Sequence, residues 1–515
     1  MYFSRFFVTL QPINKMIGMM RAKRIIMMAI LIMGICWESS AQTLGTTDQA
    51  DGIDNRKIVV LSDPHVMAPG LLVNEGTAWT TYLSGQRKME DYSQSLFDNM
   101  IERIKQDLRP GLVLISGDLT KDGEQVSHQY VTGKLDELRA MGIQTLVIPG
   151  NHDRDANPDA VYYDGEDTTP ADVATDDWFA AQYADYGYGA GSEREESTLT
   201  YACEPIAGLV VIGIDSGTDG SVSQTTLDWV AEKATAANAS GKKVIAMMHH
   251  PLIPHFTGVD TFVATAVVDN YENVRNTLAD AGIRVVFTGH FHTSDIARDW
   301  NADKTCEIYD VNTGSLISYP CDYREVTLSA DLTEMAITTG RIYEEVPEAK
   351  DRLGEAVESQ LSARGTVYRL IAPTAVRAFI IHAEGNENEN DDSAETLSIL
   401  ENAAEYGKAF VGEEKAQQLL ALANSMLQDK SQYRTDREDQ TNDLTLSIKL
   451  AEGSSMMGDV NGDNAVNVAD IVEIINFMND QASEHFNEQV ADITGEGDVN
   501  QEDINALLFL IMTPY

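Results

Sequence analysis

The sequence predicts an α/β layered fold for the larger part of the chain. Between residues 57 and 345, apolar runs of strand length alternate with stretches of helical periodicity, which is typical of sheets covered by helices. Val59 to Leu61 and Leu112 to Ile115 are unbroken apolar runs, and such strands are buried on both faces. Because ligands bind where the strands of α/β sheets end in loops, function is expected at the strand ends.

Six strands and four helices are predicted in this region. The strands are Ile58–Leu61, Leu112–Ile115, Thr145–Ile148, Leu209–Ile214, Val244–Met248 and Val285–Phe287. The helices are Tyr92–Asp107, Gln125–Met141, Gln224–Ala237 and Tyr271–Ala281. Alternation of apolar and polar residues over 325–345 predicts further strands that complete the sheets.

The composition limits the classes of partner. The chain has 515 residues, which is too long for one compact domain, and a formal net charge of −44. This acidity argues against nucleic acid as a bulk partner, because affinity for nucleic acid comes from neutralising phosphates. No basic cluster suited to a highly charged substrate is evident.

Residues 1–42 are predicted to be an export signal, with translation beginning at Met1, Met16 or Met19. An apolar run of 13 residues, Ile25 to Trp37, follows a short basic region. A membrane-spanning helix needs about 20 residues, so we expect an exported protein, periplasmic or extracellular, without a membrane span after cleavage. Lipidation at Cys36 is not favoured, because Ile35 stands where a small residue is expected. Residues 43–56 are polar and small and are predicted to be a linker.

Polar clusters follow five of the predicted strands. They are Asp63-Pro64-His65, Gly117-Asp118, Gly150-Asn151-His152-Asp153, His249-His250-Pro251 and Gly289-His290-Phe291-His292. Six of the ten histidines of the chain lie in these clusters, and scattered core or surface histidines would not segregate in this way. Imidazole and carboxylate together suit Fe, Mn, Zn, Ni or Co rather than Ca. Two such ions side by side can clamp the attacking and leaving oxygens of a phosphoryl transfer, so the clusters predict a dinuclear site.

These motifs, over roughly residues 57–345, resemble those of the calcineurin-like metallophosphoesterase superfamily. The resemblance implies a sandwich of two mixed β-sheets flanked by helices, and the activity of a phosphodiesterase or phosphomonoesterase. It implies two sets of metal ligands, which are Asp63, His65 and His292 for the first ion and Asn151, His249 and His290 for the second, with Asp118 as the bridge. It also implies that His152 stabilises the transition state or protonates the leaving group, while Asp153 orients its ring. His250 would support the ligands without binding metal.

The function expected from these residues is hydrolysis of a small-molecule phosphate ester by a hydroxide that bridges the two metals. The alternative is a non-catalytic, metal-containing binding protein attached to a cell-surface or scaffold partner. The insertion after the catalytic loop, residues 156–194, is rich in Asp, Tyr and Gly. It is predicted to form a lid or a wall of the substrate site.

Residues 346–450 are predicted to form a mostly helical extension. Ala349–Leu361 and Glu413–Leu427 have helical periodicity. Alternating leucine and isoleucine residues over 444–450 predict a closing strand. Cys306 and Cys321 bracket a short segment, so a disulfide between them is expected in an oxidising compartment.

Residues 451–515 contain a duplicated loop with the spacing of an EF-hand calcium loop. The first copy offers Asp459, Asn461, Asp463, Ala465, Asn467 and Asp470, and the second offers Asp492, Thr494, Glu496, Asp498, Asn500 and Asp503. A predicted helix follows each loop, position 12 is Asp, and no entering helix is evident. The region thereby resembles a dockerin domain, a small all-α domain. The resemblance implies bound Ca²⁺ and a cohesin-like or cell-surface partner.

Overall fold

The computed structural model describes residues 52–155, 158–255, 266–343, 346–363 and 445–450. It also describes isolated positions between 376 and 421 and, with gaps, residues 458–512. The predicted export signal and most of the predicted linker lie outside the described residues. Among the helices that are described, none combines the length and apolar character needed to cross a bilayer.

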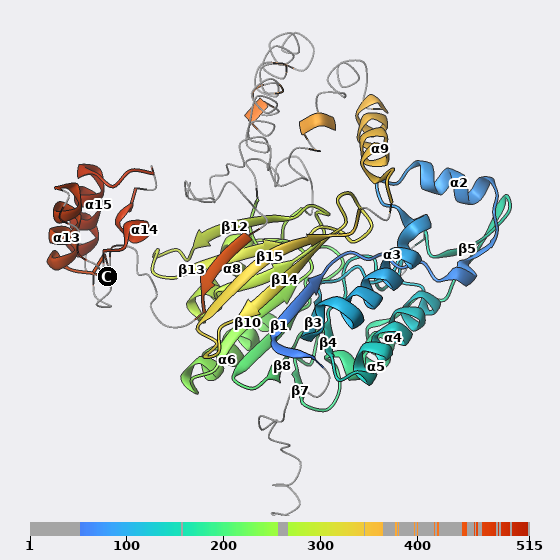
Figure 1. Ribbon diagram of the computed structural model, residues 1–515, viewed down its shortest axis with the longest axis horizontal. Coiled ribbons are helices and arrows are strands. Elements are labelled where there is room, and N and C mark those ends of the chain that lie inside the picture. The colour runs from blue at the N-terminus through green and yellow to red at the C-terminus, as the bar shows by residue number, and fades with distance from the viewer. Residues whose placement is uncertain are drawn as a thin grey trace, which may run out of the picture. The chain divides into compact units, whose positions relative to one another are not determined.

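Two mixed β-sheets form the centre of the fold (Figure 1). The first sheet comprises β1 (Asp54–Leu61), β3 (Pro110–Ile115), β4 (Gln144–Val147), β14 (Asp322–Leu328), β15 (Glu334–Arg341) and β16 (Thr445–Lys449). The second comprises β7 (Ser192–Arg194), β8 (Tyr201–Ile206), β9 (Leu209–Ile214), β10 (Lys243–Met248), β11 (Val285–Thr288), β12 (Asp295–Trp300) and β13 (Glu307–Asn312). Their strand orders are β16-β15-β14-β1-β3-β4 and β12-β13-β11-β10-β9-β8-β7. In the first sheet β1 is parallel to β3 and antiparallel to β14.

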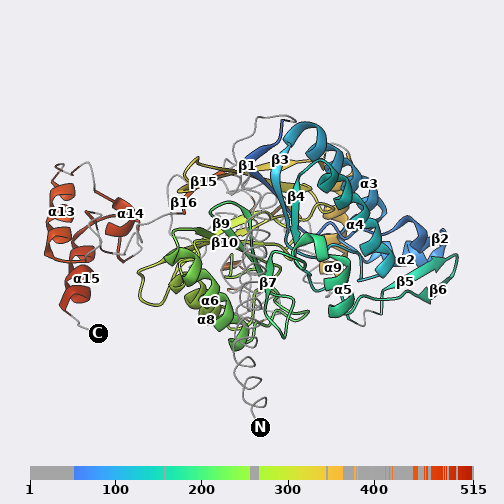
Figure 2. The same cartoon turned by 90° about the horizontal axis from the view of Figure 1, so that it is seen from below.

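Helices cover the outer faces of both sheets (Figure 2). The first sheet carries α3 (Glu90–Arg103) and α4 (Gln125–Ala140), whose apolar side chains join the core that includes β1 and β3. The second carries α6 (Gln224–Ala239) and α8 (Tyr271–Asp280). The predicted sandwich of two mixed sheets flanked by helices is confirmed.

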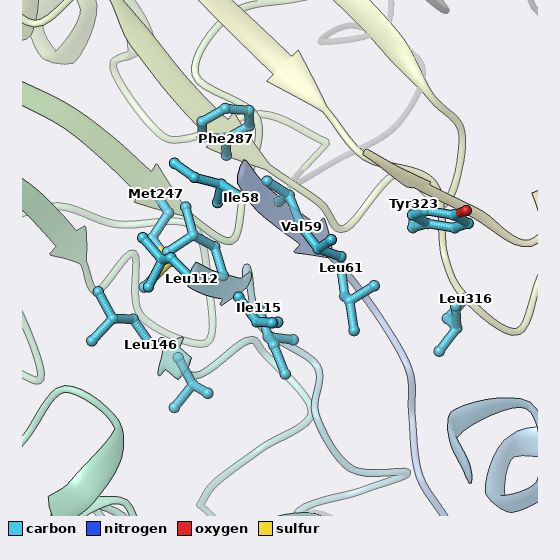
Figure 3. Packing of buried hydrophobic residues seen from close by; sticks show 14 of the residues in the cluster. Ile58, Val59, Leu61, Leu112, Ile115, Leu146, Met247, Phe287, Leu316 and Tyr323 are labelled. Atoms are coloured by element: carbon cyan, nitrogen blue, oxygen red, sulfur yellow. The ribbon is translucent and has the colours of Figure 1, made fainter. Parts of the chain in front are cut away.

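The alternation of side chains along β10 shows how the layers are built. Ile245 and Met247 point into the core between the sheets, whereas Val244, Ala246 and Met248 pack under α6 and α8. Figure 3 shows Met247 and Phe287 of the second sheet against Ile58 and Leu112 of the first. Both faces of such a strand are covered, one by the other sheet and one by helices, so the strand must be apolar on both faces.

All six predicted strands and four predicted helices are present, with boundaries shifted by a few residues. β1 begins at Asp54, inside the predicted linker, and α3 is followed by a π-helical turn, Ile104–Leu108. A small three-stranded sheet was not predicted. It comprises β2 (Leu72–Asn74), β5 (Val161–Asp164) and β6 (Asp167–Pro170), and α2 (Thr77–Ser84) packs against it. Its strands are short and mostly exposed, so they carry little periodic signal.

The tyrosines of the insertion 156–194 do not form the lid or the wall of the substrate site that the sequence predicts. Tyr183, Tyr186 and Tyr188 follow α5 (Asp176–Gln182) and are buried in the main core. The hydroxyl of Tyr183 lies 2.8 Å from Nδ1 of the buried His128. These tyrosines therefore stabilise the domain and do not line an opening.

The region after residue 345 is partly described. The predicted helix at Ala349 is confirmed as α9 (Ala349–Ala363), and the predicted closing strand is β16, which pairs antiparallel with β15. The predicted helix Glu413–Leu427 lies almost entirely outside the described residues. Because β16 belongs to the first sheet, the end of the predicted extension is part of the two-sheet fold.

The predicted disulfide between Cys306 and Cys321 is wrong, because both residues are thiols in the structure. Cys306 packs against the apolar cluster under α6 and α8, whereas Cys321 is buried in the larger core cluster that contains β1 and β3. The two side chains therefore belong to different clusters.

His255 is a buried ion-pairing residue that the sequence did not reveal. Its ring lies between two carboxylates, with Nδ1 3.1 Å from Asp295 Oδ2 and Nε2 3.1 Å from Asp310 Oδ2. Burial lowers the pKa of His255, but the two aspartates raise it to about 10. Asp310 also accepts the backbone N–H groups of Leu252 and Ile253, so the loop after β10 is fixed through this carboxylate.

We expect His255→Gln to destabilise the domain most at mildly acidic pH. The raised pKa stabilises the fold fully below the unfolded pKa of about 6.5, and this contribution is lost as pH rises through about 10. Urea unfolding of wild type and variant at pH 6 should differ by a few kcal/mol, and the difference should shrink towards pH 10. A difference that is constant across this range would contradict the ion-pair explanation.

Candidate metal centre

The five polar clusters lie at the carboxyl ends of strands from both sheets. Asp63 and His65 follow β1, Asp118 follows β3, and Asn151 follows β4. The remaining histidines follow strands of the second sheet, His249 after β10 and His290 and His292 after β11. Because neighbouring parallel strands end at the same edge, these side chains converge.

The backbone is strained where the clusters turn. Five of their residues have left-handed φ angles, which are 49° for Asp63, 40° for His65, 48° for Asp118, 68° for His290 and 62° for His292. Such conformations cost about 1–3 kcal/mol each and persist only where the surroundings impose them. The presence of five such residues in one place indicates that the geometry of this site is kept at a cost in local backbone stability.

Two glycines permit close approach within the site. A Cβ at Gly150 would lie 2.2 Å from Asp118 Oδ1, and one at Gly289 would lie 1.8 Å from Ser62 Oγ. Neither position tolerates a side chain without a shift of the candidate ligands. Close packing against neighbouring side chains therefore explains why both positions are glycine.

The first group of candidate ligands comprises Asp63, His65, Asp118 and His292, whose ligand atoms all lie within 4.8 Å of one another. His65 Nε2 is 3.1 Å from His292 Nε2 and 3.5 Å from Asp118 Oδ2. Asp63 Oδ2 accepts the Ser62 hydroxyl and the His290 N–H. Its other oxygen, Oδ1, is buried without a hydrogen-bond partner, 3.2 Å from His292 Nε2. An orphaned carboxylate oxygen among imidazoles fits a cation.

The second group comprises Asp118, His249 and His290. His249 Nε2 is 3.4 Å from Asp118 Oδ2 and 3.3 Å from His290 Nδ1. Asn151 Oδ1 lies 2.9 Å from each of these two ring nitrogens. Asp118 Oδ2 therefore faces both groups, as a bridging ligand must.

The neighbours of His249 and His250 separate their roles. His249 Nδ1 lies 2.9 Å from the carbonyl of Ser116. It donates its proton there, so Nε2 is the ring nitrogen that faces the candidate metal site. His250 is buried and outside the ligand group, with Nδ1 2.8 Å from Ser216 Oγ and its ring packed on His290.

The candidate ligands shift one another's pKa values. Burial by itself raises the pKa of Asp118, but His249, His152 and His65 hold it well below its usual value. Burial lowers the pKa of His249, yet Asp118 raises it to about 9. Burial and the neighbouring His249 lower the pKa of His290 to about 4. Asp118 is thus ionised at neutral pH, in the state that binds metal.

His152 stands beside these groups and remains accessible. Its side chain is 29% exposed, and its ring lies edge-on to His65 with centroids 4.9 Å apart. Its backbone N–H donates to Asp118 Oδ1 at 2.8 Å. Its Nδ1 lies 2.9 Å from Asp122 Oδ1, which leaves Nε2 for a substrate.

The carboxylate that orients His152 is Asp122, and the expectation for Asp153 is corrected. Both Asp153 oxygens are occupied by backbone and hydroxyl donors, from Leu119 and Gly150 at one oxygen and from Thr120 at the other. Asp153 therefore fixes the catalytic loop to the loop after β3. Burial raises the pKa of Asp122, but the hydrogen bond with His152 and the charge of Lys121 lower it to about 2.

Sequence reasoning missed Asp122, Lys88 and the Ser116 carbonyl. Asp122 stands four residues after Asp118, and that spacing is the signal that could have identified it. A backbone carbonyl leaves no trace in a sequence. Lys88 is far from every motif along the chain, although its Nζ is 3.3 Å from His65 Nδ1.

Two families match the chain. Residues 56–294 match the family described as Calcineurin-like phosphoesterase, and residues 457–508 match the Dockerin type I domain. The chain therefore contains a calcineurin-like phosphoesterase domain followed by a dockerin domain, as the motifs predicted.

One curated relative is a "Probable cyclic nucleotide phosphodiesterase" of a Synechococcus strain, 24% identical over 206 residues. The match covers 39% of this chain and spans 64% of the length of that relative.

Among solved structures, a dimetal phosphatase from Danio rerio is 13% identical, with 56% of this chain and 98% of that chain covered at a TM-score of 0.39. A purple acid phosphatase from yellow lupin, Lupinus luteus, is 10% identical, with 56% and 52% covered at a TM-score of 0.36.

In the dockerin domain, helices follow both predicted calcium loops. They are α13 (Val468–Met478) and α15 (Gln501–Met512), with the short α14 (Glu488–Ala491) between them. Asp470, at position 12 of the first loop, is buried and accepts the backbone N–H groups of Val460 and Asn461 at one oxygen. In the second loop, Asp503 Oδ1 accepts a hydrogen bond from the backbone N–H of Thr494. Asp459, Asp463, Ala465 and Glu496 lie outside the described residues.

Asp122→Asn should lower kcat by roughly 10–100-fold, as loss of an orienting partner does, while metal content stays unchanged. Asp153→Asn is the matched comparison. It should mainly lower the melting temperature, because an amide oxygen cannot replace both carboxylate oxygens. Steady-state kinetics, metal analysis and thermal unfolding of both variants measure this. Wild-type kcat in Asp122→Asn would refute the orienting role.

Proposed function

We propose that this protein is an exported phosphoesterase whose site holds two divalent transition-metal ions. The observation that carries the proposal is the orphaned, buried Asp63 Oδ1, which lies in one ligand group with His65 and His292, while Asp118 joins this group to His249 and His290. Asp63, His65, Asp118 and His292 would hold one ion, and Asp118, Asn151, His249 and His290 the other. When bound, such ions polarise phosphoryl oxygens and lower the pKa of water to near neutrality.

The protein residues supply orientation and a proton. Asp122 keeps the Nδ1 proton of His152 and turns Nε2 towards the open side of the site. An imidazole N–H is a common general acid, so Nε2–H of His152 can protonate a departing alkoxide. Asp153 and the Asp118–His152 backbone hydrogen bond keep this ring in place relative to the ligands.

Small phosphate diesters and monoesters are the proposed substrates. The printed name of the Synechococcus relative supports diesters. The loop after β13 also reaches the site, since Ser315 Oγ donates to the Asp63 carbonyl and Ser318 Oγ lies 3.2 Å from His292 Nδ1.

His152→Ala should retain its metals and lose turnover by about 10²–10⁴-fold, the usual contribution of a general acid. Hydrolysis of p-nitrophenyl phosphate and bis(p-nitrophenyl) phosphate by Mn-loaded protein measures the loss, with elemental analysis of both samples. Removal of metal by a chelator should abolish turnover, and added Mn²⁺ should restore it. A metal-loaded wild type that cleaves neither ester would favour the binding-protein alternative.

We further propose that the dockerin domain binds Ca²⁺ and attaches the enzyme to a cohesin-like partner outside the cell. Side-chain oxygens recur at matching loop positions, and the Asp470 and Asp503 carboxylates already close both loops from within. Val468, Val472 and Ile475 on α13 are 61%, 49% and 43% exposed, an apolar face suited to a partner.

Ca²⁺ should increase the helical content of residues 451–515, since binding energy is folding energy where a site does not form alone. Circular dichroism at 222 nm with Ca²⁺ and with a chelator measures this. Asp470→Ala should weaken the response, and Glu488→Ala, outside both loops, should keep it. The same spectrum with and without Ca²⁺ would refute the calcium proposal.

A further inference from the structure

The loop that joins β13 to β14, residues 313–321, leads from the second sheet to the first. It is buried along its whole length, although loops normally run over the surface. Leu316 of this loop belongs to the core cluster that contains β1 and β3 (Figure 3). Buried polar groups need hydrogen-bond partners, and several of those in this loop find them at the turns that carry candidate metal ligands.

On the second sheet, Asn312 at the end of β13 holds the turn that carries His290. Its Nδ2 donates to the Gly289 carbonyl at 2.6 Å and to Thr288 Oγ1 at 3.1 Å. The Gly289 carbonyl and the His290 N–H belong to one peptide group, and that N–H donates to Asp63 Oδ2 at 2.9 Å. The peptide group before His290 is therefore held from both sides, in a turn where His290 has a left-handed φ angle of 68°.

On the first sheet, the same loop holds the turn that carries Asp63. Ser315 Oγ donates to the Asp63 carbonyl at 2.7 Å, and the backbone N–H of Leu316 donates to the Ser62 carbonyl at 3.1 Å. Asp63 also has a left-handed φ angle, 49°. One buried segment thus bonds to a strained turn in each of the two groups of candidate ligands.

Ser318, further along the loop, lies against a candidate ligand ring. Its Oγ is 3.2 Å from His292 Nδ1. The other ring nitrogen of His292, Nε2, faces the first ligand group, 3.1 Å from His65 Nε2 and 3.2 Å from Asp63 Oδ1. A histidine that binds metal through Nε2 donates its Nδ1 proton to a neighbouring acceptor, and Ser318 Oγ occupies the position of that acceptor.

The loop has anchors of its own, away from the ligands. Arg324 on β14 is buried, and its guanidinium donates to the Asn312 carbonyl at 2.6 Å. The backbone N–H of Gly314 donates to Ser294 Oγ at 3.0 Å. Since both ends of the stretch are fixed in this way, Asn312 and Ser315 offer their donors from set positions.

We propose that Asn312 and Ser315 are positioning residues for the two halves of the metal centre. Asn312 acts through His290 and Ser315 acts through Asp63, each by holding the strained turn of its ligand in the conformation that binds metal. This inference rests on the proposed function, because it takes these ligands to hold two ions. It assigns a role to residues that lie outside the five polar clusters.

Binding of Mn²⁺ to the full chain tests the proposal, with Ca²⁺ present throughout to saturate the C-terminal loops. Equilibrium dialysis of metal-free protein against rising Mn²⁺, followed by elemental analysis, measures the affinity of each ion. Asn312→Ala and Ser315→Ala should each weaken one ion about 10–100-fold, as loss of a partner of a metal ligand does. Asn301→Ala is the matched control and should keep both affinities. Asn301 is a buried asparagine in the turn between β12 and β13, where it donates to Asp280.

Two ligand variants show which ion each residue serves. In His290→Ala the first ligand group remains, and Ser315→Ala should weaken its ion, whereas Asn312→Ala should leave that ion unchanged. In Asp63→Ala the second group remains, and the two effects should be exchanged. A purely structural role would weaken both ions in both backgrounds, so this exchange separates positioning from general loss of stability.

Thermal unfolding of the metal-free proteins checks that the variants fold. If Ser315→Ala does not fold, Ser318→Ala takes its place and should likewise weaken only the ion of the first group. Unchanged affinities, or equal weakening of both ions in both backgrounds, would overturn the inference. Two bound ions without turnover of either p-nitrophenyl ester would reject the proposed function and leave the inference standing. A wild type that binds no Mn²⁺ at these ligands would overturn both.

Discussion

The carboxylate of Asp118 is the interaction on which the rest of the site depends. One oxygen accepts the backbone N–H of His152, and the other faces the imidazoles of both ligand groups. These imidazoles come from strands of two different sheets, so a single side chain fixes the distance between the sheets where they meet. Gly150 has no side chain because Asp118 occupies the space that a Cβ would need.

Next to this carboxylate lies a buried polar network that holds the ring of His152. Lys121 is fully buried and pairs with Asp122 and Glu124, and its Nζ donates to the carbonyl of Asp159. Burying so many charges is costly unless each has partners. Since each of these residues is partnered, the network restricts His152 to one orientation before any substrate arrives. Rigidity of the site thus comes from charges that contribute little net stability.

The sequence was sufficient for the strands and for the ligand clusters, because both depend on local patterns. Apolar runs mark β1, β3 and β10, and each cluster follows directly in the chain. The features that the sequence could not reveal depend on contacts between segments that are distant in the chain. Asp153 is next to His152 in the chain whereas Asp122 is 30 residues away, and the hydrogen bonds of these two carboxylates show that Asp122 is the one that holds the ring. Cys306 and Cys321 are close in sequence but pack in different core clusters, which no spacing rule indicates.

The position of β16 has a mechanical consequence. It is the edge strand of the first sheet, paired antiparallel with β15 alone, and the dockerin domain follows it in the chain. If a partner holds that domain, tension on the tether enters the catalytic domain through the hydrogen bonds between β16 and β15. Two strands, β15 and β14, then separate the strand under tension, β16, from β1, which is followed by Asp63 and His65. A tethered enzyme could lose its edge strand under shear and still keep its metal ligands in register.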